Sequence, residues 1–423
     1  MLIEFRVQNF RSLRDENILS MVANNDKTLK ETNVITSGIP SLPGILRTAG
    51  IYGANASGKS NFVRAMVVMR TIVLQSAVLA PGQPFNVVQP FMLDPEQRSR
   101  PTEFEVTFKV NDVRYQFGFA VTATRITREW LIAYKTQRPQ NWYTREYNEI
   151  SGEDDYKFGP HFQGQRQIWQ ASTRPNALFL SIAIQLNNEQ LKPVFEWFAT
   201  GLTVVENGGF PIYQGLSPLD LTLAQVQKSE STREAVTEFL SDADIGISKI
   251  EITKEKGYQQ AISFDASGNI AATRQEAEIP VPIFWHSASK GEAQFRLGDE
   301  SEGTQRLFML AGPLFEMLRT GCVLFVDELD RSLHAHLVHQ LVRIFQNPAS
   351  NPNGAQLIFT THDTSLLHAD LLRRDQFWFV EKDADQASAI FPLTEFSPRK
   401  NEALERAYLS GRYGAVPILK NHR

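Results

Sequence analysis

Cysteine is almost absent from this chain, since Cys322 is the only one among 423 residues. A single cysteine excludes an intramolecular disulfide and a C-x-x-C zinc site, and it fits a reducing, cytoplasmic setting. We find no apolar run of about 18 residues and no signal-peptide core at the N-terminus, so we expect no membrane partner. The net charge is only −4, which gives no global sign of nucleic-acid binding. A net charge of this size does not exclude a local basic patch on the surface.

Length and composition indicate a globular protein with more than one lobe. A chain of 423 residues exceeds one ordinary hydrophobic core. Its 42% hydrophobic and 21% charged residues are typical of soluble proteins. We therefore expect two or three lobes.

Residues 53–60, GANASGKS, have the pattern G-x-x-x-x-G-K-[ST] of a phosphate-binding loop. The apolar residues 49–52 predict a strand before it, and 61–74 predict a helix after it. Backbone N–H groups of such a loop point at phosphates, and the helix N-terminus adds partial positive charge. Lys59 can reach the β- and γ-phosphates of ATP, and the Ser60 hydroxyl can bind Mg²⁺. The alternative is a glycine-rich turn without a ligand. The further candidate cofactor-binding residues of this loop are Gly53, Asn55, Ser57 and Gly58.

Two acidic residues follow a second apolar stretch, 323–326. Asp327 is placed to hold Mg²⁺ through its water shell beside Ser60, and Glu328 to act as general base on the attacking water. An exposed acidic turn is the alternative, and the buried character of the preceding stretch argues against it. A third apolar stretch, 356–360, ends in Thr361 and His362. Hydrolysis would then be an in-line attack by water, with Lys59 stabilising the developing charge.

The intervening segments predict a β-rich part followed by a helical part. Residues 103–135 alternate apolar and polar as an antiparallel meander, with a turn at 111–112. Residues 136–170 combine aromatic and basic side chains with weak periodicity, which fits loops with packed rings or, alternatively, a surface for single-stranded nucleic acid. Helices are expected over 175–200 and 218–242, and a loop over 22–44. Strands are expected near 249–253, 260–264 and 281–285, with a turn at Gly268.

The N-terminal strand, 1–8, runs into Asn9-Phe10-Arg11-Ser12, which resembles the opening of the RecF/SMC-like branch of ABC-type ATPases. That resemblance makes Arg11 a candidate nucleotide contact, with an ordinary surface arginine as the alternative. It also makes Gln89 a candidate for the glutamine that senses the metal, with a plain loop residue as the alternative.

The same resemblance extends to the C-terminal half of the chain. It identifies Ser301 and Gly303 with the ABC signature that meets the γ-phosphate held by a second subunit, the alternative being a simple capped helix. It further implies that His362 is the switch histidine beside the γ-phosphate. In this class the two faces complete each other across a dimer, so a homodimer or larger assembly is expected.

Five stretches are also similar to ATPases of prokaryotic phage-defence and abortive-infection systems of the RloA/AbiL type. They are N-F-R-S, G-A-N-A-S-G-K-S, E-S-x-G-T, D-E-L-D-R-S-L-H and the tail 408–417. The resemblance implies an ABC-type head of the P-loop NTPase α/β class, with a mixed sheet flanked by helices, a β-meander and an inserted helical lobe. The mixed sheet would combine the N-terminal strand with the strands that end at Gly53, Asp327 and His362. The expected lobes are 1–135, 136–280 and 281–423.

The resemblance also implies a function. It predicts a Mg²⁺-dependent ATPase that serves as sensor or regulator of phage defence and controls a separate toxin or nuclease, with DNA or a phage component as further candidate partners. Two alternatives stay open: a RecF/SMC-like DNA-binding ATPase in repair, and a nucleotide-gated scaffold with negligible turnover.

Overall fold

A computed structural model describes residues 1–39, 42, 44–206, 216–241, 246–264, 270–331, 335–399 and 402–416, without the side chains of 259–275. The chain forms two compact units, the first comprising Met1–Gly209 and Met317–Arg423 and the second Phe210–Glu316. The predicted lobe 136–280 is therefore divided between the units. Residues 136–206 remain with the first unit because their strands pair with the meander.

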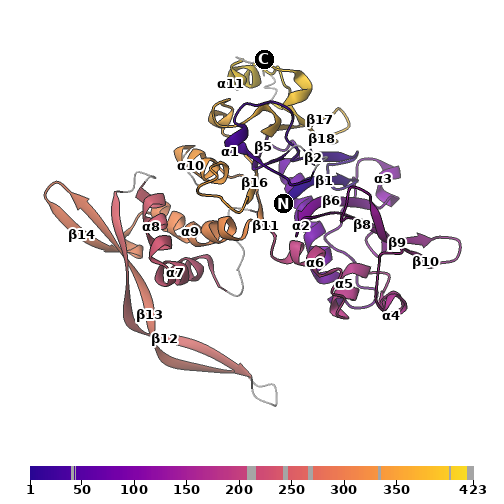
Figure 1. Ribbon diagram of the computed structural model, residues 1–423, viewed down its shortest axis with the longest axis horizontal. Helices are drawn as coiled ribbons and strands as arrows, with labels where there is room; N and C mark the ends of the chain where they lie inside the picture. The colour runs from indigo at the N-terminus through magenta and orange to yellow at the C-terminus, as the bar shows by residue number, and fades with distance from the viewer. Residues whose placement is uncertain are drawn as a thin grey trace. The chain divides into compact units, whose positions relative to one another are not determined.

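A six-stranded mixed sheet lies in the first unit, in the order β11-β15-β16-β5-β17-β18. Its strands are β11 (Leu202–Val205), β15 (Val323–Val326), β16 (Gln356–Thr360), β5 (Thr48–Tyr52), β17 (Phe377–Lys382) and β18 (Ser388–Pro392). The first five run parallel and β18 is antiparallel. Strands β15, β16 and β5 are buried on both faces, which explains why apolar and small residues predominate in them. Because these strands run parallel, their carboxyl ends lie at one edge of the sheet, where α/β proteins bind ligands. Figure 1 labels β5 and β16 of this sheet next to each other.

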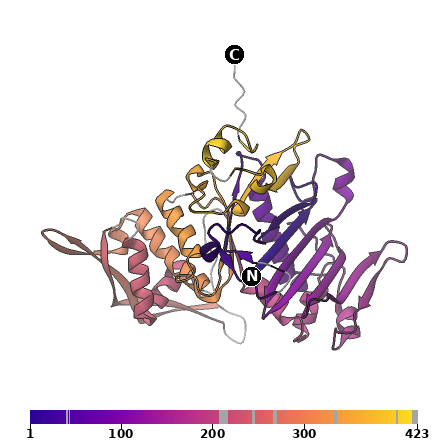
Figure 2. The same ribbon diagram turned by 45° about the horizontal axis from the view of Figure 1, so that its top comes forward.

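A seven-stranded antiparallel sheet, in the order β10-β9-β8-β7-β6-β1-β2, is the other large layer of the first unit. Figure 2 shows its strands side by side. They are β1 (Leu2–Gln8), β2 (Asn17–Ser20), β6 (Thr102–Val110), β7 (Val113–Val121), β8 (Ile126–Tyr134), β9 (Gln140–Asn148) and β10 (Glu153–Phe158). Asn111 and Asp112 join β6 to β7 with φ of 48° and 61°. Two left-handed residues give a tight turn whose twist suits a hairpin. The predicted meander is confirmed for β6 to β8, and β9 and β10 extend it.

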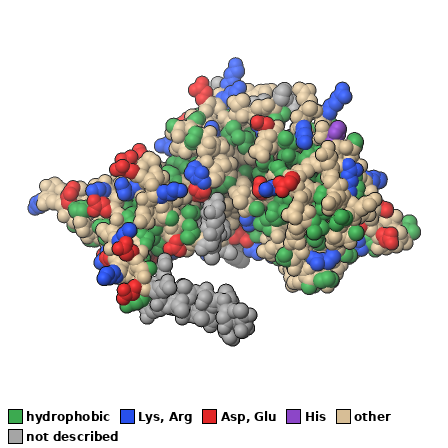
Figure 3. Space-filling view, turned by 60° about the horizontal axis from the view of Figure 1, so that its bottom comes forward, with side chains coloured by type: hydrophobic (Ala, Val, Ile, Leu, Met, Phe, Trp, Pro, Cys, Tyr) green, Lys and Arg blue, Asp and Glu red, His purple; other side chains and the backbone are tan. Residues whose placement is uncertain are grey.

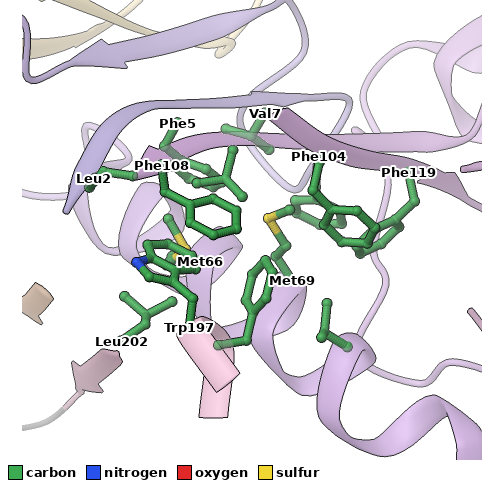
Figure 4. Packing of buried hydrophobic residues seen from close by; sticks show 14 of the residues in the cluster. Leu2, Phe5, Val7, Met66, Met69, Phe104, Phe108, Phe119, Trp197 and Leu202 are labelled. Carbon is green, nitrogen blue, oxygen red and sulfur yellow. The ribbon is translucent and has the colours of Figure 1, made fainter. Parts of the chain in front are cut away.

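Helices join the sheets of the first unit into one core. They are α1 (Lys30–Asn33), α2 (Lys59–Gln75), α3 (Pro95–Ser99), α4 (Arg166–Ser172), α5 (Phe179–Gln185), α6 (Lys192–Ala199), α10 (Ala335–Gln346) and α11 (Leu404–Leu409). Figure 4 shows Met66 and Met69 of α2 among the aromatic rings of β6 and β7 and beside Trp197 of α6. The Phe108 and Trp197 rings stack at a centroid distance of 4.2 Å. The segment Lys59–Val78 is long and apolar enough to cross a membrane by length and composition alone, but 56% of it is buried within this core.

The second unit combines two helices with a long hairpin. Helices α7 (Pro218–Lys228) and α8 (Glu230–Ser241) precede strands β12 (Ile247–Phe264), β13 (Ile270–Ala288) and β14 (Gly291–Arg296). Helix α9 (Glu302–Thr320) begins in this unit and ends in the first. Its Phe308 ring packs edge-on against Phe284 of β13. The helix expected over 218–242 is divided into α7 and α8, and the strands expected near 249–253 and 260–264 are one strand, β12. The strand expected near 281–285 is confirmed as part of the longer β13. The turn predicted at Gly268 lies outside the described residues.

Three expectations about individual segments were wrong. The N-terminal strand β1 pairs with β2 and β6 and therefore belongs to the antiparallel sheet, not to the mixed one. Residues 136–170 form β9, β10 and α4 rather than loops, with a register shift at Leu131/Ile132 where β9 joins β8. Residues 22–44 include α1 and the strand β3 (Val34–Ile35), which pairs with β4 (Ile45–Leu46).

Candidate functional site

The phosphate-binding loop connects the buried strand β5 to α2, as its pattern requires. Gly58 has a φ of 115°, in the region that favours glycine. At Gly53 an added Cβ would lie 2.5 Å from the Val380 carbonyl oxygen, so only glycine fits there. Ser57 and Lys59 are buried, whereas Asn55 and Ser60 are exposed. The loop is thus held against the sheet on one side and open on the other.

Lys59 lies inside the curve of this loop. Its Nζ donates hydrogen bonds to the carbonyl oxygens of Gly53 at 2.7 Å and Ala54 at 3.1 Å. Burial lowers the pKa of Lys59 from its usual 10.5 to about 8, while Asp327 and the carboxylates of Glu328 and Asp330 act in the opposite direction. These interactions place the ammonium group near the acidic cluster at the ends of β15 and β16.

Hydrogen bonds to Asp327 join three segments that are far apart in the sequence. The Ser60 hydroxyl lies 3.2 Å from Asp327 Oδ1, across 267 positions of sequence. The Thr360 hydroxyl donates to the same oxygen at 2.7 Å and accepts the Glu328 N–H at 2.7 Å. Thr360 is therefore a site residue that the sequence patterns missed. Its only signal is its position at the end of the apolar strand β16.

The segment after Asp327 carries charged groups at the carboxyl end of the parallel strands of the mixed sheet. Glu328 is half-buried and has a φ of 56°, a left-handed conformation that is costly for a residue with a side chain. Its carboxylate lies 3.5 Å from the Arg331 guanidinium. The Asp330 carboxylate accepts the backbone N–H of His362 at 3.2 Å, which joins the loops after β15 and β16. The His362 residue is exposed at this edge. Residues 332–334, the end of the D-E-L-D-R-S-L-H stretch, lie outside the described residues.

The oxygen atoms around Asp327 suit a magnesium ion bound together with a nucleotide. Ser60 Oγ and Asp327 Oδ1 are hard donors, 3.2 Å apart, which is the ligand type that Mg²⁺ prefers. Among the described residues, no group of three or more His, Cys, Asp or Glu side chains could hold a metal by itself. Mg²⁺ at this place would therefore take its remaining ligands from water and phosphate oxygens, which is its usual behaviour.

Arg11 and Gln89 lie together, but only their backbones are joined. The Arg11 N–H donates to the Gln89 carbonyl at 2.7 Å. Burial and the neighbouring Arg64 lower the pKa of Arg11, while Glu206 opposes this. Arg64 belongs to α2 and pairs with Glu206 at 2.6 Å. The Gln89 residue is exposed. Arg11 is therefore held near the first turns of α2, and no described contact joins Gln89 to the Asp327 cluster.

Ser301 and Gly303 lie in the second unit at the start of α9. The Ser301 hydroxyl accepts the Thr304 N–H at 3.2 Å and lies 2.9 Å from the Thr304 hydroxyl. This geometry is a helix cap, which was the alternative interpretation of the motif. Ser301, Glu302 and Gly303 are all exposed, so the cap also leaves this helix end accessible.

A comparison with protein families adds an independent observation. Residues 49–368 match the model of a family described as "AAA domain, putative AbiEii toxin, Type IV TA system". No curated protein matches the chain. The matched range begins in β5 and ends just beyond His362, so it contains every residue described around Asp327.

Proposed function

The chain belongs to this family of AAA domains, and we propose that it is an ATPase that binds and hydrolyses ATP with Mg²⁺. Membership of the family supports a P-loop ATPase with the corresponding α/β fold. The observation that carries the proposal is the contact of Ser60 with Asp327, because it joins the phosphate-binding loop to the acidic strand end. The charges of Asp327, Glu328 and Asp330 act on the Lys59 ammonium group. A site of this composition is built for a triphosphate and its metal.

Each side chain has a defined task in this proposal. The amides of residues 53–60 and the N-terminus of α2 bind the phosphates, and the Lys59 ammonium neutralises charge on the terminal phosphate. Glu328 positions the attacking water and accepts its proton. Thr360 fixes Glu328 through its backbone and Asp327 through its carboxylate. Bound Mg²⁺ supplies Lewis-acid polarisation of the phosphate oxygens. We propose that the exposed His362 senses the terminal phosphate.

The replacement Glu328→Gln tests the proposed chemistry. It keeps the shape of the side chain but removes the proton acceptor, and general bases contribute roughly 10²–10⁴-fold to rate. We expect the kcat for ATP hydrolysis to fall by about that factor, while the ATP dissociation constant changes little. A coupled phosphate-release assay and fluorescent-nucleotide binding measure the two quantities.

Arg331→Gln provides the matched control. Arg331 contacts Glu328 at 3.5 Å but is exposed, so its replacement should change kcat far less. Full turnover by Glu328→Gln would show that another group activates the water. Negligible turnover by the unaltered chain, despite tight ATP binding, would instead favour a nucleotide-gated scaffold.

We further propose that two copies of the chain assemble when ATP is bound. The exposed Ser301–Gly303 end of α9 would meet the terminal phosphate held by the partner copy, as in the ABC-type head that the sequence resembles. A helix N-terminus is suited to this contact, because its dipole favours negative charge. The Glu328→Gln chain should hold ATP without hydrolysing it, so it is the form in which to test for this dimer. Light scattering of this chain in Mg²⁺ and ATP should report twice the mass of a single chain.

The cellular role that we propose is regulation of a separate toxin or nuclease in phage defence, in the cytoplasm. The toxin–antitoxin context in the description of the family supports a separate protein partner. A gene for a nuclease or toxin beside the gene for this chain would support the role further. On the face shown in Figure 3, Lys and Arg side chains are interspersed with Asp and Glu rather than forming a basic stripe. Salt-sensitive DNA binding by the purified chain would favour the repair alternative instead.

A further inference from the structure

Two serines far apart in sequence form a hydrogen-bonded chain behind the phosphate-binding loop. Ser388 begins β18 and is 2% exposed, and its hydroxyl lies 2.6 Å from the Ser57 carbonyl oxygen and 2.8 Å from Ser12 Oγ. The Asn61 side-chain amide donates to Ser12 Oγ at 2.8 Å. The Ser388 N–H donates to the Ser12 carbonyl at 2.7 Å, which fixes the two serines relative to each other. Ser12 and Ser388 both lie outside the range matched by the family model.

The direction of these hydrogen bonds follows from the number of protons. A serine hydroxyl has one proton, and a carbonyl oxygen can only accept. The Ser388 hydroxyl is the donor to both the Ser57 carbonyl and Ser12 Oγ, so its one proton serves two acceptors, and the contact with the carbonyl, at 2.6 Å, is the shorter. Ser12 Oγ also accepts from the Asn61 side-chain amide. The result is a relay that joins Asn61, Ser12 and Ser388 to the Ser57 carbonyl.

The end of this relay determines where a phosphate-binding amide points. The Ser57 carbonyl and the Gly58 N–H belong to the same planar, trans peptide, so they point in opposite directions. A hydroxyl that holds the Ser57 carbonyl on one side therefore holds the Gly58 N–H toward the other. Gly58 has a φ of 115°, a conformation that glycine leaves easily, so this orientation needs external support.

The relay is anchored in surrounding structure. Arg14, two residues after Ser12, pairs with Asp383 at 3.1 Å and Asp385 at 3.2 Å in the β17–β18 turn. A Cβ on Gly58 would collide with the Ser388 side chain, so the loop and the relay are in direct contact. The loop is thus clamped by the N-terminal segment and by the last hairpin of the mixed sheet.

We propose that Ser12 and Ser388 are positioning residues that preorganise the Gly58 amide for the terminal phosphates of the nucleotide. The proposal deepens the ATPase function and rests on it. Neither serine touches the nucleotide, and each acts through the Ser57–Gly58 peptide. Preorganised donors bind a developing charge without the cost of reorienting at the moment of reaction.

The test compares Ser388→Ala and Ser12→Ala with Ser12→Thr, which keeps the hydroxyl at a half-buried position. We expect amide exchange in the 53–60 loop of the nucleotide-free chain to rise about fivefold in both alanine variants, as loss of one hydrogen bond predicts. ATP affinity should weaken by a similar factor. The double alanine variant should lose no more than Ser388→Ala alone, because a relay acts as a unit. Ser12→Thr should restore both quantities.

Ser20→Ala is the matched control, because within the described part of the chain the Ser20 hydroxyl accepts the nearby Val22 N–H, at 3.3 Å, and makes no other hydrogen bond. Equal thermal unfolding temperatures for the serine-to-alanine variants would exclude a general loss of fold. Unchanged loop exchange in Ser388→Ala and Ser12→Ala would overturn the positioning role, whatever the nucleotide affinity. Absence of ATP binding by the unaltered chain would instead overturn the ATPase proposal, and the exchange comparison would still decide whether the serines hold the loop.

Discussion

At the scale of single residues, the site depends on groups held in states that are unfavourable in isolation. Lys59 is buried, and burial lowers the pKa of its ammonium group to about 8. Glu328 has a left-handed backbone at a φ of 56°. Both costs are offset by neighbours, since Thr360 holds the Glu328 N–H and the charges of Asp327, Glu328 and Asp330 act to raise the pKa of Lys59. Such strain is characteristic of functional sites.

The pKa of Lys59 predicts how ATP affinity depends on pH. The free chain keeps Lys59 charged below about pH 8, and the charge is lost as pH rises through that value. ATP affinity should therefore be nearly constant just below pH 8 and then fall by up to about tenfold per pH unit. Titrations with fluorescent ATP between pH 7 and pH 10 measure this dependence. Lys59→Arg keeps its charge over the range, so its residual binding should not show the fall, and a parallel fall in both chains would assign the effect to another group.

At the scale of elements, the N-terminus of α5 is held by a buried carboxylate from β8. Glu129 is completely buried, and its oxygens accept the N–H groups of Phe179 at 2.7 Å and Leu180 at 2.9 Å. The Tyr143 hydroxyl donates to it at 2.8 Å. Arg145, also buried, lies 3.9 Å away and pairs with Asp154. This network attaches α5 to the extended antiparallel sheet.

Replacing Glu129 with alanine should therefore destabilise the first unit. The change leaves Arg145 without one of its buried acidic neighbours and leaves two helix N–H groups and a tyrosine hydroxyl unpaired. We expect the free energy of unfolding to fall by about 3–5 kcal/mol, measured by urea titration with tryptophan fluorescence. Glu146→Ala, at an exposed position of the adjacent β9, should change it by about 0.5 kcal/mol or less. A similar small effect of both changes would show that the network contributes no net stability.

Sequence patterns predicted the strands and helices that are specified by residues within one segment. They missed those that depend on pairing with a segment far away in the sequence. Strands β5, β15 and β16 were recognisable because parallel, doubly buried strands are continuous apolar runs. The strands β9 and β10 were missed because buried Arg145 and Trp142 interrupt a simple alternation in β9, and the pairing of β9 with β8 contains a register shift. The sheet to which β1 belongs is set by its partners β2 and β6, which no local pattern reveals.

The same difference applies to the candidate site, where residues in local motifs could be predicted and residues defined by distant partners could not. Lys59, Asp327 and His362 were predicted as site residues because each follows a strand in a recognisable motif. Thr360 and Ser388 were not, because an isolated hydroxyl has no sequence signature until its partners are known. The hydroxyl of Thr360 becomes informative only beside Asp327, at 2.7 Å.

At the scale of the whole molecule, parallel strand order explains why segments so distant in sequence meet. The phosphate-binding loop follows β5, the acidic pair follows β15 and His362 follows β16, and these strands are neighbours in the order β15-β16-β5. Their carboxyl ends must therefore lie at one edge. We propose that this edge is one site for ATP and magnesium.

Calorimetric titration of Mg²⁺–ATP into the full chain and into Lys59→Ala is the direct test of this proposal. We expect one nucleotide per chain, with affinity lost or weakened at least about a hundredfold in Lys59→Ala, because a buried charge-assisted contact to phosphate is removed. Thermal unfolding of the free variant confirms that it is folded. Equal affinity in the two folded proteins, or no binding to the unaltered chain, would contradict it.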